Sequence, residues 1–502
     1  MPPSHRLAIA DVPAGAPSSP SGNGPNRRGP FRPDHLTAAR QRLSGQMLTR
    51  LFHSLDWCVL ALAAAASVVD WTAGPALRPV SAVLPLAAAC VVAAAALRGL
   101  DAYDFRAGES AIGHLLRVVA ACLAGVLGGL AASAAPPDTR AAVLALAPAQ
   151  TAGLAAVHFY AWRAVRRWRA QGRLTPNILI VGATPNAVRL IEGALASRHV
   201  NVLGIFDDRS ARSPRAIHGV PVLGDTQALL GHSILPYVDQ IVITVTASAH
   251  DRVRALIEQL KVLPNAVTLF VDEGNEQSTT AALSRLMKAP LRLVSGVEQD
   301  ERRAFFKRIQ DVALAGLGIV VTGPLMAAIA VAVRLDSPGP VLFRQRRHGF
   351  NNEAIMVWKF RSMRQEATDH TASRQVTRDD DRVTRVGRFI RRTSLDELPQ
   401  LFNVLGGQMS MVGPRPHSIG MLTAGEESQR LVAEYSWRHR IKPGITGWAQ
   451  INGSRGPVHT REEVEARVAL DLEYIDRQSF WLDLWIIFMT VPRLLGDREA
   501  VR

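Results

Sequence analysis

The chain has 502 residues, of which 48% are hydrophobic and 20% are charged. That length allows two or three domains, and the balance is too apolar for an ordinary soluble enzyme and too charged for a pure transporter. The 58 Lys and Arg residues exceed the 43 Asp and Glu residues, which gives a formal net charge of +15. With apolar segments present, this excess favours anionic lipids and phosphorylated ligands over nucleic acid. The three cysteines lie far apart in apolar stretches, which argues against a disulfide framework or a zinc site.

Residues 1–45 are rich in Pro, Gly, Ser and Arg and lack the apolar core of a signal peptide. Such a composition buries too little apolar surface to fold. We therefore expect a disordered cytoplasmic tail over this segment.

Residues 46–170 are expected to form a bundle of four transmembrane helices. The apolar, Ala-rich segments are Trp57–Val69, Val80–Leu97, Val118–Ala135 and Ala141–Trp162. Arginines gather before the first segment, between the second and the third, and after the fourth. Because cytoplasmic loops carry the excess of Lys and Arg, both ends of the bundle are predicted to be cytoplasmic.

Residues 171–298 alternate short β-like runs with amphipathic stretches, which predicts a small doubly wound α/β domain. The β-like runs are 177–181, 202–206, 240–245 and 267–271. The turn after the first run has a single glycine, Gly182, so the dinucleotide-binding fingerprint is missing. We expect a degenerate Rossmann-like domain without a redox cofactor, which either senses a ligand or is purely structural.

Residues 299–335 contain the uncharged stretch Val312–Val333, which is long enough to cross a bilayer. Gly323-Pro324 lies at its middle, where proline removes a backbone hydrogen bond and kinks a helix. Both flanks are basic, so a spanning helix would place one basic cluster outside the cell. We predict a re-entrant membrane helix that keeps both flanks at anionic inner-leaflet lipids. A fifth straight transmembrane helix is the alternative.

Residues 336–502 hold most of the motifs. Basic residues alternate with turns and aromatic side chains in Phe343–Gly349 and Trp358–Met363, which suits a diphosphate and a flat base. Arg415 lies between Pro414 and Pro416, and the two prolines restrict its backbone as a phosphate clamp requires. A Trp-rich stretch near 480–488 fits an interfacial helix and a core helix equally well.

Two adjacent carboxylates, Asp396 and Glu397, lie in the stretch Arg391–Gln400. Ser394 and Glu397 fit an S-x-x-E capping box, so we expect a helix to begin here. A helix N-terminus would keep Asp396 ionised and attract phosphate oxygens. Neighbouring carboxylates on a helix point about 100° apart, which favours one as a nucleophile and the other as a metal ligand.

Residues from about 305 to 495 resemble the bacterial sugar transferase domain of monotopic phosphoglycosyl transferases. The matching stretches are FKRIQD at 306–311, LDSPGPVLFRQRRHGFNN at 335–352, KFRSM at 359–363, RVTRVGRFIRRTSLDELPQLFNVLGGQMSMVGPRP at 382–416 and IKPGITGWAQING at 441–453. The bundle and the α/β domain match the long form of the family, which resembles undecaprenyl-phosphate glucose phosphotransferases. The expected fold is therefore a membrane protein of the α plus α/β class, with a mainly helical cytoplasmic catalytic domain at 336–502.

The resemblance implies transfer of a hexose-1-phosphate from a UDP-sugar to undecaprenyl phosphate, with release of UMP. UDP-glucose is the favoured donor, and galactose is the alternative sugar. The implied mechanism is ping-pong: Asp396 attacks the β-phosphate and carries the phosphosugar, while Glu397, together with Asp396, holds Mg²⁺. The resemblance places the chain in the bacterial inner membrane as a multi-pass protein with a cytoplasmic catalytic domain. It would act at the first membrane step of exopolysaccharide, capsule or O-antigen synthesis.

The resemblance also assigns roles to other residues. Substrate contacts are expected from Gln345, Lys359, Arg361, Arg391, Pro414, Arg415 and Pro416. Positions of the re-entrant helix match Lys307, Arg308, Asp311 and Pro324. The break in that helix is often Ser-Pro in the family and is Gly-Pro here, so any bond from the serine hydroxyl to the backbone is lost.

Two other classes of function remain as alternatives. A membrane-anchored oxidoreductase acting on nucleotide sugars would need a nicotinamide cofactor, and the missing glycine fingerprint argues against one. A non-enzymatic scaffold or sensor would not need an Asp-Glu pair beside paired arginines. No nucleic-acid partner is expected, and self-association into a homo-oligomer is left open.

Overall fold

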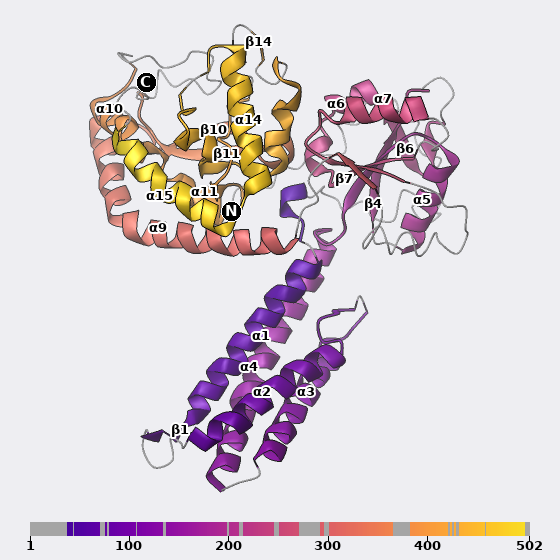
Figure 1. The fold of residues 1–502 in the computed structure, drawn as a ribbon, viewed down its shortest axis with the longest axis vertical. Coiled ribbons are helices and arrows are strands. Elements are labelled where there is room, and N and C mark those ends of the chain that lie inside the picture. The colour runs from indigo at the N-terminus through magenta and orange to yellow at the C-terminus, as the bar shows by residue number, and fades with distance from the viewer. Residues whose placement is uncertain are drawn as a thin grey trace. The chain divides into compact units, whose positions relative to one another are not determined.

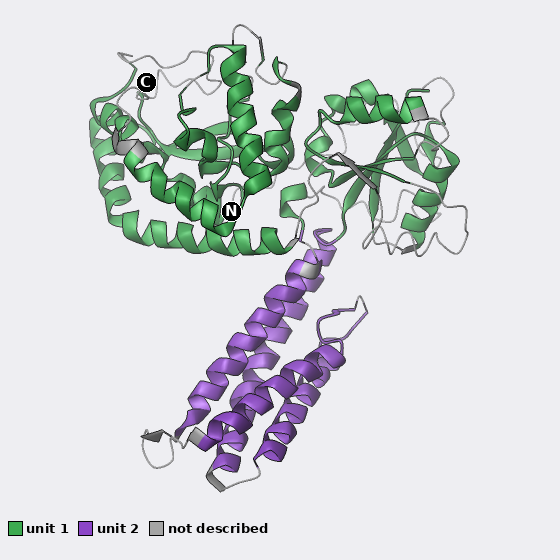
Figure 2. Ribbon diagram, in the orientation of Figure 1, with its two compact units in different colours: residues 1–42, 175–502 green, residues 43–174 purple. Residues whose placement is uncertain are grey.

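The structure is a computed structural model, and it forms two compact units, residues 43–174 and residues 1–42 with 175–502 (Figure 2). The described residues are 38–43, 45–70, 76–77, 80–106, 108–133, 137–197, 200–209, 214–244, 250–270, 292–295, 301–364, 382–419, 422–423, 426–427, 431–456 and 458–496. Most of the predicted tail lies outside them. In its last part, Ala39–Gln41 forms a 3₁₀ turn (η2) and Arg42 pairs with Asp239 at 3.2 Å.

Four helices form the unit at 43–174 (Figure 1). They are α1 (Gly45–Val68), α2 (Val83–Gly99, after the 3₁₀ turn η3, Val80–Ala82), α3 (Ala111–Ala132) and α4 (Pro137–Ala170), and a short antiparallel pair, β1 (Val69–Asp70) and β2 (Ala76–Leu77), follows α1. The four predicted segments are therefore helical, although α1 begins earlier than predicted. Among the described residues, α1, α3, α4 and α9 (Glu301–Asp336) are long and apolar enough to cross a membrane, whereas α2 falls short of that length.

The bundle packs through small residues on α2 and α3. A Cβ added at Gly125 would lie 2.7 Å from both the Ala89 carbonyl oxygen and the Ala93 Cβ, so only glycine permits this approach of the two helices. Small residues at helix contacts are typical of membrane bundles, because apolar lipid supplies no hydrophobic force between helices. The buried core is correspondingly rich in alanine.

A chain of polar side chains crosses the bundle core. The Tyr103 hydroxyl donates to Asp56 Oδ2 at 2.6 Å, and His158 Nε2 lies 3.1 Å from the same oxygen. His158 Nδ1 lies 3.1 Å from His114 Nε2, and His114 Nδ1 lies 3.4 Å from Arg117 Nη2. Asp56, His114 and His158 are buried. One set of tautomers satisfies all four contacts, with each group donating toward Asp56.

Residues 177–295 build a seven-stranded sheet in the order β5-β6-β4-β3-β7-β8-β9. The central strands β6 (Val220–Gly224), β4 (Asn201–Phe206), β3 (Asn177–Val181), β7 (Gln240–Ile243) and β8 (Ala266–Leu269) are parallel, and β5 (Ala216–Ile217) and β9 (Arg292–Ser295) pair antiparallel at the edges. The described helices of this part are α5 (Pro185–Ser197), α6 (Thr226–Leu230), the 3₁₀ turn η4 (Leu235–Tyr237) and α7 (His250–Leu260). The four predicted β-runs are confirmed as strands, and β5, β6 and β9 were not predicted.

Helix α9 is continuous over 36 residues and contains Pro324. At about 1.5 Å per residue it is about 54 Å long, more than a bilayer crossing needs. Its ribbon bends along its length (Figure 1). Thr322 Oγ1 donates to the Gly318 carbonyl at 2.7 Å just before Pro324. A hydroxyl bond to the backbone is therefore present near the break, at threonine instead of serine.

After α9, the described residues combine helices with three small two-stranded sheets, and helical residues outnumber strand residues, as predicted. The strands are β10 (Leu342–His348) with β11 (Ala354–Phe360), β12 (Ser410–Val412) with β15 (Gly444–Thr446), and β13 (Leu422–Thr423) with β14 (Glu426–Glu427). The helices and 3₁₀ turns among these described residues are η5 (Phe350–Asn352), α10 (Arg385–Arg392), η7 (Leu395–Glu397), α11 (Gln400–Leu405), η8 (Ala433–Arg440), α13 (Trp448–Ile451), α14 (Arg461–Arg477) and α15 (Phe480–Gly496). Helix α15 is amphipathic: Ile486 is buried, whereas Trp481, Trp485 and Phe488 are exposed.

Candidate active site

Asp396 and Glu397 lie in a tight turn. Ser394 adopts a left-handed conformation with φ of 56°, and Leu395–Glu397 forms a single 3₁₀ turn before α11. The predicted capping box is wrong, because the Ser394 side chain makes no cap bond and its hydroxyl accepts from Arg455 Nη2 at 2.6 Å. The two carboxylates therefore do not begin a regular α-helix.

Two cations hold the Glu397 carboxylate. Lys359 Nζ, from β11, lies 2.7 Å from Oε1, and Arg415 Nη2, from the loop after β12, lies 2.7 Å from the same oxygen. Arg415 Nη1 adds a longer bond of 3.3 Å to Oε2. Burial opposes ionisation of Glu397, but Arg415 and Lys359 outweigh it and lower the pKa of Glu397 well below its usual value. Glu397 is thus a fixed negative charge.

Asp396 has the opposite electrostatic environment. Burial raises the pKa of Asp396, the neighbouring Glu397 charge raises it further, and Lys359, Arg391 and Arg415 only partly oppose the shift. The helix N-terminus that was expected to stabilise ionised Asp396 is also absent, because only a 3₁₀ turn forms at this position. In the described part of the chain, no hydrogen bond reaches the Asp396 carboxylate. Glu397 is thus paired with two cations, whereas the Asp396 carboxylate is available to a ligand.

Arg347 is a site residue that the sequence did not single out. Its Nη1 donates to the Pro416 carbonyl at 2.6 Å, and its Nη2 donates to Gln345 Oε1 at 2.9 Å. Burial and the Arg415 charge lower the pKa of Arg347 to about 10, against the pull of Glu397 and Asp396. Gln345, which was predicted to contact substrate, orients this arginine from two positions away on β10. That i, i+2 spacing on a strand is the signal that could have found Arg347.

The remaining predicted contacts are divided between the site and its supports. Arg391, in the last turn of α10, acts on Asp396 through its charge. Arg361 is buried, and its Nη2 donates to the Ser337 carbonyl at 2.7 Å, so it fixes the turn after α9. The Pro414 carbonyl accepts from Gly444 N at 3.0 Å. A Cβ added at Gly413 would lie 2.5 Å from the Lys442 carbonyl oxygen, so glycine is required where these two loops meet.

The predicted residues at the start of α9 anchor that helix to the catalytic fold. Lys307 Nζ lies 2.9 Å from Asp311 Oδ1 and 2.8 Å from Asp483 Oδ2. Asp311 Oδ1 accepts from Ser410 Oγ at 2.9 Å and from the Met411 amide at 3.0 Å. Arg308, the third of these residues, donates to the carbonyls of Val404 and Leu405, each at 2.7 Å.

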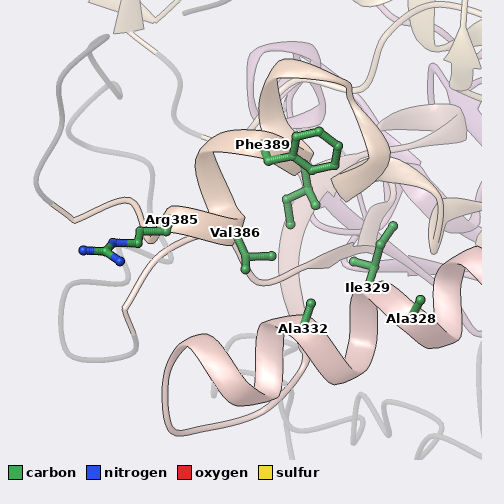
Figure 3. A pocket seen from close by; sticks show the side chains of 7 residues that line it. Ala328, Ile329, Ala332, Arg385, Val386 and Phe389 are labelled. Carbon is green, nitrogen blue, oxygen red and sulfur yellow. The ribbon is translucent and has the colours of Figure 1, made fainter.

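An apolar groove lies between α9 and α10 (Figure 3). Its lining residues are Ala328, Ile329, Ala332, Arg385, Val386, Phe389 and Ile390. The side chains of Ile329 and Val386 approach each other across the groove, whereas Arg385 points away from it (Figure 3). The groove therefore offers an almost wholly hydrocarbon surface on the helix that leads to the Asp396 turn.

The site has few candidate metal ligands. Within the described residues, no group of three or more His, Cys, Asp or Glu side chains is arranged to hold a metal ion. Mg²⁺ is commonly bound through one or two carboxylates together with substrate phosphates, rather than by a complete protein cage. Asp396 and Glu397 meet that smaller requirement, although two cations already contact Glu397.

Two parts of the chain match known families. Residues 302–497 match the family described as bacterial sugar transferase, and residues 98–270 match the family described as a CoA-binding domain. The first match covers α9 from Arg302 onward, the Asp396 turn and the side chains around it.

Three relatives extend this match. The chain is 38% identical over 339 residues to a UDP-glucose:undecaprenyl-phosphate glucose-1-phosphate transferase of Xanthomonas campestris pv. campestris, covering 66% of this chain and 69% of the relative. It is 39% identical to an undecaprenyl-phosphate glucose phosphotransferase of Komagataeibacter xylinus, covering 65% of this chain and 60% of that protein. It is 48% identical over 185 residues to the exopolysaccharide production protein PSS of Rhizobium leguminosarum bv. phaseoli, covering 37% of this chain and 92% of that protein. The chain belongs to the bacterial sugar transferase family.

Proposed function

We propose that this protein transfers a hexose-1-phosphate, with glucose favoured, from a UDP-sugar to undecaprenyl phosphate and releases UMP. One observation carries the proposal: Asp396 presents a carboxylate without a hydrogen-bond partner among the described residues, beside Glu397, which Lys359 and Arg415 hold. The names of the Xanthomonas and Komagataeibacter relatives support glucose as the sugar and undecaprenyl phosphate as the lipid. The third relative's name supports a place in exopolysaccharide synthesis.

The proposed reaction has two steps. An Asp396 carboxylate oxygen attacks the β-phosphorus of the UDP-sugar, and the bond from that phosphorus to the bridging oxygen breaks, so that UMP leaves with the electron pair. A phosphate oxygen of the polyprenyl phosphate then attacks the same phosphorus and displaces Asp396 as a free carboxylate. Because attack requires the ionised carboxylate, Lys359, Arg391 and Arg415 assist by opposing the raised pKa of Asp396.

Cations on three elements surround the place where the diphosphate would bind. Lys359 comes from β11, Arg391 from α10 and Arg415 from the loop after β12. Mg²⁺ held by Asp396 and Glu397 would neutralise charge on the diphosphate and on the departing UMP. Guanidinium groups suit this task because their paired N–H donors match phosphate oxygens.

We also propose that α9 enters the inner leaflet and returns, with the catalytic part on the cytoplasmic side of the bacterial inner membrane. Pro324 within the helix, the bent ribbon in Figure 1 and the basic flanks support this over a straight span. The exposed aromatic side chains of α15 would lie at the lipid headgroups. The groove between α9 and α10 would let the hydrocarbon chain of the acceptor leave the site along apolar surface (Figure 3).

The α/β part gives little support to an oxidoreductase. In dinucleotide-binding folds, an acidic residue near the end of the second strand binds the ribose. The corresponding carboxylate here, Asp207 after β4, accepts instead from the backbone amides of Ala183 at 2.8 Å and Arg209 at 2.9 Å. We therefore propose a Rossmann-like domain with a structural or ligand-sensing role.

The proposal is tested by UMP release from purified full-length protein in the presence of Mg²⁺. UDP-glucose, UDP-galactose and UDP-N-acetylglucosamine are compared, with undecaprenyl phosphate present or absent. We expect UMP from UDP-glucose, and a glycolipid product only when the lipid is added. Nicotinamide reduction with a UDP-sugar and no UMP release would favour the oxidoreductase, and inactivity with every donor would favour the scaffold.

A further inference from the structure

A buried ion pair contacts the loop that follows β12 and carries Arg415, residues 413–417 (the Arg415 loop). Arg438, in η8, and Asp471, in α14, are 1% and 2% exposed, and Arg438 Nη2 lies 2.6 Å from Asp471 Oδ2. Removing two charges from water costs several kcal/mol per ion, so a buried pair is weak support for stability by itself. Its other contacts show what the pair can do.

Those contacts go to the backbone and side chains of the Arg415 loop. Arg438 Nη2 donates to the Arg415 carbonyl at 3.0 Å, and Arg438 Nη1 lies 2.8 Å from His417 Nδ1. Between them, the Pro416 carbonyl accepts from Arg347. Two arginines therefore hold three consecutive residues of this loop, while the Arg415 guanidinium pairs with Glu397.

Helix α14 also contacts β12, the strand that precedes the Arg415 loop. Tyr474 lies three residues after Asp471, hence on the same helix face, and its hydroxyl lies 3.2 Å from the Val412 carbonyl. That hydroxyl also lies 2.6 Å from Asp483 Oδ1, which orients it. Helix α14 thus reaches the Val412 carbonyl directly through Tyr474, whereas Asp471 reaches the Arg415 carbonyl only through Arg438.

We propose that Arg438 and Asp471 are positioning residues for Arg415. The inference rests on the proposed function, in which Arg415 binds the donor diphosphate. Arg438 fixes the Arg415 carbonyl, and Asp471 fixes the Arg438 guanidinium, so the rotation that aims Arg415 is set by groups that never touch substrate. Small misplacement of a positioning group can reduce rates by about 100-fold.

A double-mutant cycle tests the proposal, because coupling between two residues appears as non-additive losses. Arg438→Lys and Asp471→Asn are each combined with Arg415→Lys in the full-length protein. kcat and KM for UMP release are measured, and the thermal shift caused by UDP serves as a probe of diphosphate binding. We expect each single variant to lose about 10- to 100-fold in kcat/KM, but less than threefold in the Arg415→Lys background. If Arg438→Lys and Asp471→Asn each reduce kcat/KM by the same factor in the wild type and in the Arg415→Lys background, the proposal is overturned.

Arg467→Lys is the matched control. Arg467 lies on α14, as Asp471 does, and is 5% exposed. Its described side-chain hydrogen bonds go to Ser454 Oγ at 2.8 Å and to the Gly456 carbonyl at 2.6 Å, and not to the Arg415 loop. We expect its loss to multiply with that of Arg415→Lys. Equal coupling from Arg467→Lys would show that only general packing is disturbed, which contradicts the proposal.

The two proposals fail in different ways. If the wild type released no UMP from any donor, the proposed function would fail, whereas the UDP thermal shift would still report whether Arg438 acts through Arg415. If Arg438→Lys does not fold, Asp471→Asn keeps the shape of the side chain and carries the cycle. Normal UDP binding and turnover by folded Asp471→Asn would contradict the proposed positioning role.

Discussion

The helical bundle and the catalytic part both bury ionisable side chains, but in opposite ways. In the bundle, Tyr103 and His158 both contact one oxygen of Asp56, and His114 continues the chain. In the catalytic part, Lys359 and Arg415 converge on Glu397, while Asp396 has no hydrogen-bond partner in the described part of the chain. In the bundle, both contacts converge on Oδ2 of a single carboxylate, and its Oδ1 is buried without a hydrogen-bond partner among the described residues. The catalytic network instead leaves the whole Asp396 carboxylate available.

This difference indicates that the bundle network serves helix packing and that the Asp396–Glu397 pair is a reactive site. A connected polar network among membrane helices specifies which helices meet and in what register, because each partner left alone would be an unpaired polar group in a dry core. Opposed shifts of two neighbouring carboxylates, by contrast, are typical of sites where each carboxylate has its own role. Substitutions in the two regions should therefore have different consequences.

Asp396→Asn should have the largest effect. An amide cannot form the phospho-enzyme, so turnover should fall to background while the protein stays folded, because Asp396 supports no other side chain through a described hydrogen bond. Wild type incubated with UDP-sugar labelled in the β-phosphate, without lipid, should retain label, and the variant should not. If the wild type turns over efficiently with lipid but retains no label without it, transfer is direct, and Asp396 acts as a base or metal ligand.

Glu397→Gln should reduce both activity and stability. It removes the negative charge that Lys359 and Arg415 share, and breaking a buried pair can cost about 3–5 kcal/mol. Because these side chains are 14–24% exposed, we expect about 2 kcal/mol and a weaker response of kcat to Mg²⁺. The loss follows from the ion pairs, because no capping box is present.

Glu465→Gln is the control for this substitution. Glu465 pairs with Arg461 at 2.8 Å on the exposed surface of α14, so its loss should change the free energy of unfolding by less than about 0.5 kcal/mol. Thermal unfolding and Mg²⁺ titration of UMP release distinguish the two variants. Equal stability of Glu397→Gln and wild type would show that the pairing of Glu397 contributes little.

Sequence patterns predicted the elements in this structure better than they predicted side-chain contacts. Apolar length gave the four bundle helices, and short β-like runs gave four strands of the sheet, because both signals are local. The pattern could not show that α1 extends back over His53 and Asp56, since these polar residues interrupt its apolar stretch. Only tertiary contact with His158 and Tyr103 explains why Asp56 is buried there.

The candidate site was predicted in part for the same reason. The motifs identified Asp396, Glu397, Lys359 and Arg415, and the structure brings their side chains together. The S-x-x-E spacing suggested a cap, but spacing does not determine the left-handed backbone of Ser394. Arg438 and Asp471 lie in elements without a recognisable motif, and their role depends on contacts between residues far apart in the chain.

Asp56→Asn tests the bundle side of the comparison and should have a smaller effect. The amide replaces an acceptor that two groups share, and polar contacts between membrane helices typically contribute about 1 kcal/mol. We expect a lower unfolding temperature in detergent and unchanged UMP release per folded molecule. Asp101→Asn, at an exposed ion pair with Arg106, should change neither quantity. Lost turnover in folded Asp56→Asn would mean that the bundle network also serves catalysis.

Lys442→Met tests whether crowded cations lower the free energy of unfolding of the catalytic part. It should have the smallest effect. Burial lowers the pKa of Lys442 to about 8 from its usual 10.5, and the Arg308 charge contributes to the shift. Between pH 8 and 10.5 the unfolded chain therefore binds more protons at this site than the folded chain does. Stability of the wild type should rise with pH through that window, and the unfavourable contribution should be fully present below pH 8.

The expected gain for Lys442→Met at pH 7 is about 1 kcal/mol, because one pKa unit corresponds to about 1.4 kcal/mol and the side chain keeps some contact with water. The free energy of unfolding, measured by denaturant titration in detergent from pH 7 to 10, should rise less steeply in the variant than in the wild type. Lys261→Met, at an exposed lysine paired with Glu258, should keep the wild-type slope. Parallel profiles for Lys442→Met and wild type would show that Lys442 carries no such burden, because the variant lacks the group whose titration the argument invokes.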